Sequence, residues 1–437
     1  MELEKQVVQC IHLLGQLIKY KYNSDSDKLG MLVLDVKGNF YSKVFDYAEQ
    51  FNRIDDLIII EPGGKYKYNP LNKPNLKPQV LANRLKNILL LFSPNNSESY
   101  WLDKVEQLLT ECIKLCRLYN NNYVTFEEIH NLINNSNYYQ EKNDILRNLF
   151  LKQKLTKEDM YNLISSLNFF EKEFFNLDSR TLSILKSETT RITNCFLSDY
   201  EIYNTFNPSP KDENFLGFKD LIDSGKIVVL KMNISNYKNI SKIIAAYLKL
   251  DFQTEVLSRL SSQKNFRKVA FISDEYHEYV TSNDADFYAQ CREAKCINIL
   301  ATQSYSSLLN TLKDETTLKV LIQSLVNKLW FRTDDTFTIE NIQKQIGKEE
   351  KEKTSTTISE SAKETYYSFL TKSLNSNNSN ISESINKYTQ FDFKYDTNYF
   401  SQKLETFTCL SFLSNGNKII TPQKIKLIPY FIDTERM

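Results

Sequence analysis

Six short runs of apolar residues occur along the chain, and amphipathic stretches separate most of them. Each run has six or seven residues, which is too short for a helix and too apolar for a strand with one face in water. Such runs are typical of strands buried on both faces of a parallel sheet. Because helical patterns lie between the runs, their order predicts an α/β fold with a parallel sheet. The runs cover residues 31–36, 57–62, 226–232, 269–274, 297–302 and 327–333.

Helical patterns alone fill the stretch from about residue 78 to residue 197, which predicts an all-α domain between the second and third strands. Residues 350–390 are polar and rich in Ser, Thr, Asn, Lys and Glu, which predicts a linker or mobile arm. The tail, residues 406–431, predicts a β-hairpin around an Asn-Gly turn. We therefore expect a sheet domain over residues 1–75 and 206–350, an all-α domain over 76–205, and a linker with a hairpin over 351–437.

The composition excludes several classes of site. The chain has 437 residues, and its 55 basic residues balance 54 acidic ones, so a nucleic-acid surface would have to be a local patch. Seven cysteines without a C-x-x-C pair and only three histidines argue against a structural zinc site. Cys112 and Cys116 share a helix face, where we expect buried thiols rather than a metal site or a disulfide. No apolar run approaches the ~18–20 residues of a membrane span, and the N-terminus does not have the pattern of a signal peptide.

Two adjacent carboxylates, Asp274 and Glu275, stand at the end of the fourth apolar run. P-loop ATPases end their Walker B strand in this way. The Asp at the strand tip holds the water shell of Mg²⁺, and the Glu polarises the water that attacks the γ-phosphate. The alternative is an ordinary solvated turn after a buried strand.

Polar residues follow two other predicted strands. Gln303 follows the strand at 297–302, at the position where motor ATPases place a side chain that senses the γ-phosphate. Asp35, Lys37 and Gly38 lie at the end of the first run, and parallel sheets bind ligands along this carboxyl edge. These three residues are candidates for nucleotide binding, and a plain strand-to-helix turn is the alternative.

Two arginines are candidates for an arginine finger that reaches the nucleotide of a neighbouring subunit. Arg292 precedes the strand that leads to Gln303, and Arg332 lies at the end of the last predicted parallel strand. A planar cation at either place would offset the charge of a phosphoryl-transfer transition state. The alternative for Arg332 is a surface salt bridge with Asp334 or Asp335.

The phosphate-binding pattern G-x-x-x-x-G-K-[ST] does not occur in the sequence. In enzymes that have it, this loop supplies a backbone nest, a phosphate-binding Lys and a hydroxyl for Mg²⁺. The sequence therefore offers half of an ATPase site.

Together these residues resemble the conjugative coupling proteins, the TraG/TraD family of type IV secretion ATPases. The resemblance rests on segments in family order: LVLDVKGNF (32–40), YNPL (68–71), YWLDKVEQLL (100–109), SILKSETTRITNCF (183–196), FISDEYHEY (271–279), REAKCINILATQSYSSL (292–308) and NKLWFRTDD (327–335). It implies a RecA-like P-loop ATPase core with a parallel sheet, interrupted by an all-α domain.

The resemblance also implies a function. Asp274 would hold Mg²⁺, Glu275 would activate water and Gln303 would sense the phosphate of ATP. The partners would be single-stranded DNA or a relaxase–DNA complex and the components of the secretion channel. The complete protein would form a homo-hexamer at the inner face of the cell membrane, where this chain would be held by its partners.

In the family, a central strand and the Walker A loop precede a helix like residues 3–21, and membrane-spanning helices lie further upstream. We therefore expect this chain to be truncated before Walker A, with an upstream polypeptide or fragment supplying the missing strand. Removing a central strand would expose backbone donors and acceptors on both neighbouring strands.

Two other functions are possible from the sequence. The first is a catalytically inactive adaptor, whose helical domain would recruit relaxase or accessory proteins without ATPase activity. The second is a DNA-packaging or chromosome-pumping motor, and the helical insertion between the second and third strands argues against it.

Overall fold

The computed structural model describes residues 3–35, 40–91, 99–152, 154–261, 266–360, 365–368, 372–376 and 381–427. Its centre is a five-stranded sheet in which all neighbouring strands run parallel, as the apolar runs predict. The spatial order is β2-β3-β1-β4-β5, so β4 lies between β1 and the edge strand β5. The strands span Gly30–Leu34 (β1), Leu57–Ile60 (β2), Ile227–Leu230 (β3), Val269–Ser273 (β4) and Cys296–Leu300 (β5).

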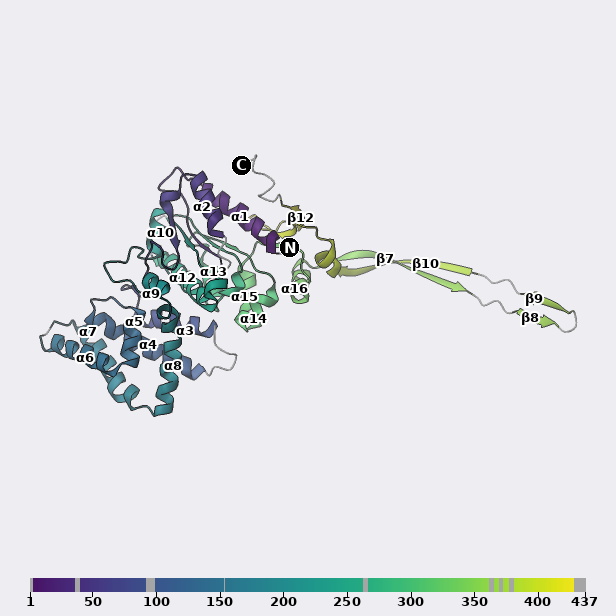
Figure 1. Ribbon diagram of the computed structural model, residues 1–437. Helices are drawn as coiled ribbons and strands as arrows, with labels where there is room; N and C mark the ends of the chain where they lie inside the picture. The colour runs from purple at the N-terminus through teal and green to yellow at the C-terminus, as the bar shows by residue number, and fades with distance from the viewer. Residues whose placement is uncertain are drawn as a thin grey trace.

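Helices cover both faces of this sheet (Figure 1). Met31 and Val33 of β1 pack in one core with α1 and α2, whereas Leu32 and Leu34 pack in the core on the opposite face. Burial on both faces explains why the strands read as continuous apolar runs. The covering helices span Leu3–Lys19 (α1), Phe40–Gln50 (α2), Phe218–Ser224 (α10), Ile234–Tyr237 (α11), Asn239–Ser258 (α12) and Asp284–Gln290 (α13).

An all-helical domain interrupts the chain between β2 and β3, as predicted, and lies at the lower left of Figure 1. Its two ends are tied to each other beside the sheet. The Gly63 amide donates to Thr205 Oγ1 at 2.9 Å, and the Tyr68 amide donates to the Thr205 carbonyl at 2.8 Å. The helices span Pro78–Leu91 (α3), Ser99–Tyr119 (α4), Phe126–Asn134 (α5), Ser136–Leu151 (α6), Lys157–Asn168 (α7), Ser179–Leu197 (α8) and Tyr200–Phe206 (α9).

A buried charge cluster fixes the helical domain to the sheet domain. Asp251 of α12 is fully buried and lies 2.8 Å from Arg84 of α3 and 3.0 Å from Lys73. The Tyr68 hydroxyl donates to the same carboxylate. Burial by itself would raise the pKa of Asp251, but the charges of Lys73 and Arg84 hold it below its ordinary value. The two domains therefore share a satisfied ionic contact.

The sixth apolar run does not join the parallel sheet, contrary to the prediction. β6 (Lys328–Trp330) pairs antiparallel with β11 (Thr408–Phe412), which pairs with β12 (Gln423–Lys426) in the predicted terminal hairpin. Trp330 packs against Phe412 with 5.7 Å between ring centroids. The C-terminal hairpin thus takes β6 as its third strand. The nearby helices span Tyr305–Leu312 (α14), Glu315–Ser324 (α15) and Thr336–Ile346 (α16).

The polar stretch predicted as a linker or mobile arm forms a long two-stranded arm. β7 (Lys348–Glu360) and β10 (Ile381–Phe393) pair antiparallel along their whole lengths and extend away from the rest of the molecule (Figure 1). β8 (Thr365–Ser368) and β9 (Ser373–Ser376) pair further along. Cross-strand hydrogen bonds and side-chain pairs join the two strands of the arm.

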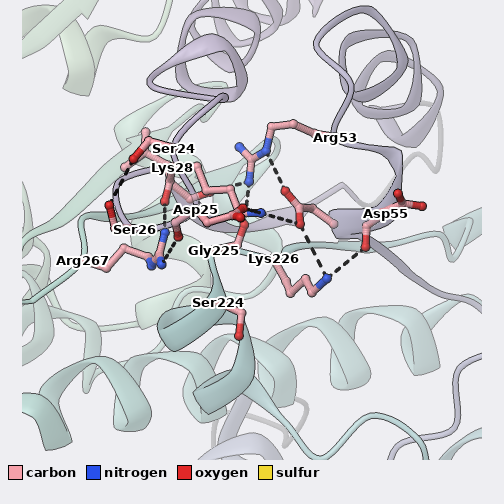
Figure 2. Close-up of polar contacts among 12 residues, drawn as sticks. Ser24, Asp25, Ser26, Lys28, Arg53, Asp55, Ser224, Gly225, Lys226 and Arg267 are labelled. Atoms are coloured by element: carbon pink, nitrogen blue, oxygen red, sulfur yellow. Dashed lines mark hydrogen bonds and ion pairs between the residues drawn. The ribbon is translucent and has the colours of Figure 1, made fainter.

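A polar network closes the amino end of the parallel sheet (Figure 2). The buried Arg53 guanidinium donates to the carbonyls of Leu29 at 2.9 Å and Gly225 at 2.6 Å, and to Asp56 at 3.1 Å. Lys28 lies 2.9 Å from the same Asp56 carboxylate. Leu29 and Asp56 directly precede β1 and β2, and Gly225 lies two residues before β3, so one side chain joins the starts of three strands.

The thiols of Cys112 and Cys116 are buried and free, as predicted, and burial raises the pKa of both. Within the described ranges, no helix combines the length and apolar character needed to cross a bilayer. The same ranges contain no group of three or more His, Cys, Asp or Glu side chains that could hold a metal ion.

Candidate functional site

Hydrogen bonds to β1 and to Tyr279, in the turn that follows, hold the tip of β4. The Asp274 amide donates to the Leu34 carbonyl of β1 at 3.1 Å. The Tyr279 hydroxyl donates to the Asp274 carbonyl at 2.6 Å and lies 2.8 Å from Ser273 Oγ. Only 3% of Asp274 is exposed. The fold therefore fixes the backbone on both sides of this carboxylate, which the sequence predicts as the Mg²⁺ ligand.

Glu275 has a left-handed backbone conformation with φ of 48°. Non-glycine residues rarely adopt this conformation, and such strain is concentrated at functional sites. The Glu275 side chain is buried, and its Oε2 lies 3.6 Å from Nδ1 of His277. The same Nδ1 lies 3.3 Å from Thr302 Oγ1. His277 thus connects the predicted catalytic base to the end of β5.

A buried ion pair supports this turn. Lys249 of α12 lies 2.5 Å from Asp284, and both side chains are fully buried. The Tyr276 hydroxyl donates to the same carboxylate, and the Tyr276 amide donates to the Ala301 carbonyl at 2.7 Å. Lys249 also donates to the Tyr279 carbonyl at 2.7 Å. The residues after Glu275 are therefore anchored to both α12 and β5, which holds Glu275 in its strained conformation.

A cavity of about 310 Å³ lies between β5 and β6. Gln303 from the end of β5 and Arg332 from the end of β6 both line it, so two of the predicted residues share one cavity. Asp274 and Glu275 are not among the lining residues, although Thr302 is. The structure therefore gathers the predicted residues at one edge of the sheet but divides them between a buried turn and an open cavity.

Two cations on the β6 side of this cavity have no carboxylate within ion-pair distance in the described part of the chain. The predicted alternative for Arg332, a salt bridge with Asp334 or Asp335, does not form, because Asp335 instead caps α16 by accepting from the Thr338 amide at 2.9 Å. Lys328 is 9% exposed, and burial lowers its pKa to about 8. Both side chains are available to an anionic group.

Other predicted residues lie apart from the cavity. Asp35 is buried and accepts from the Phe40 amide at 2.7 Å, so its carboxylate is engaged at the start of α2. Lys37 and Gly38 lie outside the described residues. Arg292 is exposed in the turn before β5, at the opposite end of that strand from the polar tips. Its role as an arginine finger stays a prediction.

His277 and Lys328 are site residues that the sequence reasoning missed. His277 is one of only three histidines and lies two residues after Glu275, so its position next to the carboxylate pair was a usable signal. Lys328 gave no such signal, because its burial depends on β6 pairing with β11, about eighty residues later in the chain.

The donor chemistry at the β4 tip fits Mg²⁺. This ion is usually held by one or two carboxylates, with water and substrate phosphates completing its shell. Asp274 and the adjacent Glu275 supply such carboxylates at a fixed strand tip. Cys10 of α1 also lines the cavity. Burial raises the pKa of its thiol, and the negative charge of Asp274 raises it further.

Residues 268–390 match the family model described as the TraM recognition site of TraD and TraG. This segment is of the TraG/TraD type. The sequence resemblance to the TraG/TraD coupling proteins is thereby confirmed, on a match that runs from β4 into β10 of the arm. A search of curated proteins gives no match.

Solved structures of one coupling protein share the fold. Unbound TrwBdeltaN70, a bacterial conjugative coupling protein, is 12% identical, with a TM-score of 0.56 over 95% of this chain and 91% of that one. The plasmid coupling protein TrwB with the GTP analogue GDPNP is 13% identical, with a TM-score of 0.57 over 95% and 92%. The structure of TrwB with ADP and Mg²⁺ is 12% identical, with a TM-score of 0.57 over 96% of this chain and 92% of that one. The predicted RecA-like core, interrupted by an all-α domain, is confirmed as the fold.

Proposed function

We propose that this chain is the motor part of a conjugative coupling protein that uses ATP hydrolysis to move DNA or a relaxase–DNA complex towards a type IV secretion channel. The observation that carries the proposal is the meeting of three strand ends. Gln303 follows β5 and Arg332 follows β6, and both line one cavity. Asp274 and Glu275 follow β4, the strand that pairs with β5. Structures of TrwB in complex with ADP and Mg²⁺ support a nucleotide as the ligand of this fold.

In this function the side chains have separate tasks. Glu275 accepts a proton from the water that attacks the γ-phosphate, and His277 holds the Glu275 carboxylate in place. The Gln303 amide donates to a phosphate oxygen at the end of β5. Arg332 has no carboxylate partner in the described chain, so its guanidinium can offset charge that develops on the transferred group. Asp274 would hold Mg²⁺, which neutralises phosphate charge when bound.

Assembly and partners follow from the same proposal. A ring of six subunits would let Arg292, exposed on the surface, act on the nucleotide of a neighbour. DNA or protein substrates would pass along that ring to the channel. The chain would work at the inner face of the membrane through its partners.

The test is nucleotide binding and hydrolysis by the purified chain. Fluorescent ATP with Mg²⁺ should bind, and Asp274→Ala should weaken binding by at least tenfold. Glu275→Gln should retain binding and lower kcat by about 10²–10⁴-fold, the usual contribution of a general base. Asp286→Asn, an exposed carboxylate on α13, is the matched control and should change neither quantity. Absence of binding at millimolar nucleotide would contradict a motor function of this chain by itself and would favour the adaptor described next.

A specific observation also favours a second function, a substrate-recruiting adaptor without ATPase activity. The matched family segment is described as a TraM recognition site, and it includes most of the exposed arm. Ile358, Ile385 and Phe391 lie on one face of the arm and are 67%, 58% and 65% exposed, which is unusual for large apolar side chains. If Ile358→Lys abolishes partner binding in a chain that does not bind nucleotide, the adaptor is the correct function.

A further inference from the structure

The arm formed by β7 and β10 has two unlike faces. Side chains alternate between the faces along each strand, and residues opposite each other in the ladder share a face. Because Ile358 lies opposite Glu383, the register places Ile358, Ile385 and Phe391 on one face, which we call the apolar face of the arm. On the opposite face, Tyr388 is the one large ring among Ser, Thr, Asn, Gln and charged side chains of the described strands.

The charges of the opposite face are paired within the arm and its base. Lys353 lies 3.0 Å from Asp392, and Lys394 lies 3.6 Å from Glu349. This face therefore satisfies its own charges and needs no partner.

The apolar face carries acidic side chains that have no such partner. Glu350, Glu352 and Glu383 are exposed, and none of them forms an ion pair with a described residue. Lys348 and Lys387 share the face, so negative charge is in excess on it. A two-stranded ribbon is only marginally stable by itself in water, and covering its apolar side chains would contribute roughly 25 cal/mol per Å². The surface that covers this face should be apolar and basic.

An apolar and basic surface lies on the helical domain, at the end of α6 and along α7. We call residues 150–152 and 154–164 the α6–α7 surface. Leu151 is 76% exposed, Tyr161 is 73% exposed and Ile164 is 53% exposed. Lys157 lies four residues before Tyr161 and seven before Ile164, so these three side chains share one face of α7.

The lysines of this surface have no carboxylate partner in the described chain. Lys152, Lys154 and Lys157 are exposed, and none of them forms an ion pair there. Of the two carboxylates nearby, Asp159 is engaged in the capping box of α7, which leaves Glu158 against three lysines. The α6–α7 surface thus has an excess of positive charge, opposite to that of the apolar face of the arm.

The two surfaces cannot meet within one chain. Figure 1 shows the arm extending from one side of the sheet domain and α6 and α7 on the other side of the molecule. Each chain therefore offers one acidic apolar surface and one basic apolar surface, and neither covers the other.

We propose that the apolar face of the arm of one copy binds the α6–α7 surface of a second copy of this chain. Ile358, Ile385 and Phe391 would cover the exposed apolar side chains of α7, and the glutamates of the arm would meet the lysines. Two different surfaces are joined, so the contact is heterologous and can be repeated from copy to copy. The inference uses no residue of the nucleotide site and does not depend on ATP hydrolysis.

The first test is sedimentation velocity of the full chain without nucleotide. The chain should associate below about 100 μM, and association should weaken as NaCl is raised from about 0.05 to 0.5 M, because salt screens exposed charges. Ile358→Ser combined with Ile385→Ser should weaken association at least about tenfold. Tyr388→Ser removes an exposed ring from the opposite face of the same arm and is the matched control, which should change nothing.

A second pair of variants tests the helical domain. Tyr161→Ser should weaken association by about tenfold, since it removes the most exposed ring of the α6–α7 surface. Tyr200→Ser removes a ring that is 79% exposed on α9, elsewhere on the same domain, and should leave association unchanged.

Charge reversal tests whether the two surfaces face each other. Each of two triple variants should associate at least about tenfold more weakly alone, because its arm and its α6–α7 surface then carry the same sign. An equimolar mixture of the two should regain the original association, since every arm then finds a surface of opposite charge. The first variant combines Glu350→Lys, Glu352→Lys and Glu383→Lys, and the second combines Lys152→Glu, Lys154→Glu and Lys157→Glu.

Three results would overturn the inference. A chain that stays monomeric at about 100 μM would leave the arm to a different protein, as the adaptor function requires. Association that neither the double isoleucine variant nor Tyr161→Ser weakens would place the contact on other surfaces. A mixture of the charge-reversed variants that does not regain association would show that these charges do not meet. Nucleotide binding is measured separately, so none of these results would decide the motor function.

Discussion

The two ends of the parallel sheet are built differently. At the amino end, Arg53 is 1% exposed and donates to groups that precede three strands, so its buried charge is fully engaged within the chain. At the carboxyl end, Gln303 lines a cavity together with Lys328 and Arg332 of the β6 segment, and no hydrogen bond or ion pair engages these three side chains in the described residues. The first arrangement stabilises the fold. The second leaves polar groups ready for a ligand.

Arg53→Met tests the amino end and should have the largest effect. The variant leaves the carbonyls of Leu29 and Gly225 and the Asp56 carboxylate with fewer buried partners. Removing one member of such a buried network destabilises by about 3–5 kcal/mol. Urea unfolding monitored by circular dichroism measures the loss. Lys344→Met, which removes an exposed ion pair with Glu340, is the control and should change stability by less than about 0.5 kcal/mol.

Lys328→Met tests the carboxyl end and should act in the opposite direction. The folded pKa of Lys328 is about 8, below the ordinary 10.5, so protonation opposes folding. The free-energy cost of burying the charged Lys328 is complete below about pH 8. It shrinks as the pH rises towards about 10.5 and is absent above that pH. The variant should therefore be more stable at pH 7 by on the order of 3 kcal/mol, with no gain above pH 10.5. A loss of stability at pH 7 would mean that the contact of Lys328 with the Phe412 ring, 5.7 Å from the ring centroid, outweighs the penalty of burying the charge.

Glu275→Gly tests the strained turn at the carboxyl end of the sheet, and we expect it to give the smallest change in stability of the three variants. Glycine adopts a φ of 48° without strain, whereas alanine keeps the Cβ that opposes it. The Gly variant should therefore be more stable than Glu275→Ala by about 1 kcal/mol, measured as the difference in thermal unfolding. Both variants should lack hydrolysis. Equal stability of the two would mean that the turn relaxes once the carboxylate is removed.

The buried strands were predictable because burial on both faces leaves a direct trace in the sequence. Met31–Leu34 and Val269–Ile272 are apolar at every position, and both form inner strands. The Asp274-Glu275 pair and Gln303 were predictable for a related reason, since each directly follows such a strand. Parallel pairing then brings their strand ends to one edge of the sheet.

The partners of polar and distant segments were not predictable. β6 reads as another parallel strand, and only its pairing with β11 takes it out of the sheet. β7 and β10 have the composition of a linker, because their stability comes from the ladder between them. The sequence also predicted open edges beside a missing central strand, but it could not say which strands would have them. In the described part of the chain, β5 and β6 each pair on one side alone, as edge strands do. The missing central strand stays a prediction.

The tied ends of the helical domain have a consequence for the folding pathway. β3 has to find β1 and β2 after a long excursion of the chain, since Gly63 and Thr205 alone are separated by 142 positions. Closing so long a loop costs about 2 kcal/mol more entropy than closing a dozen residues, and it slows nucleation. If the helices fold first, the contacts of Thr205 with Gly63 and Tyr68 reduce that excursion to a short loop. The folded helical domain would then bring β3 close to β1 and β2 and so favour their pairing.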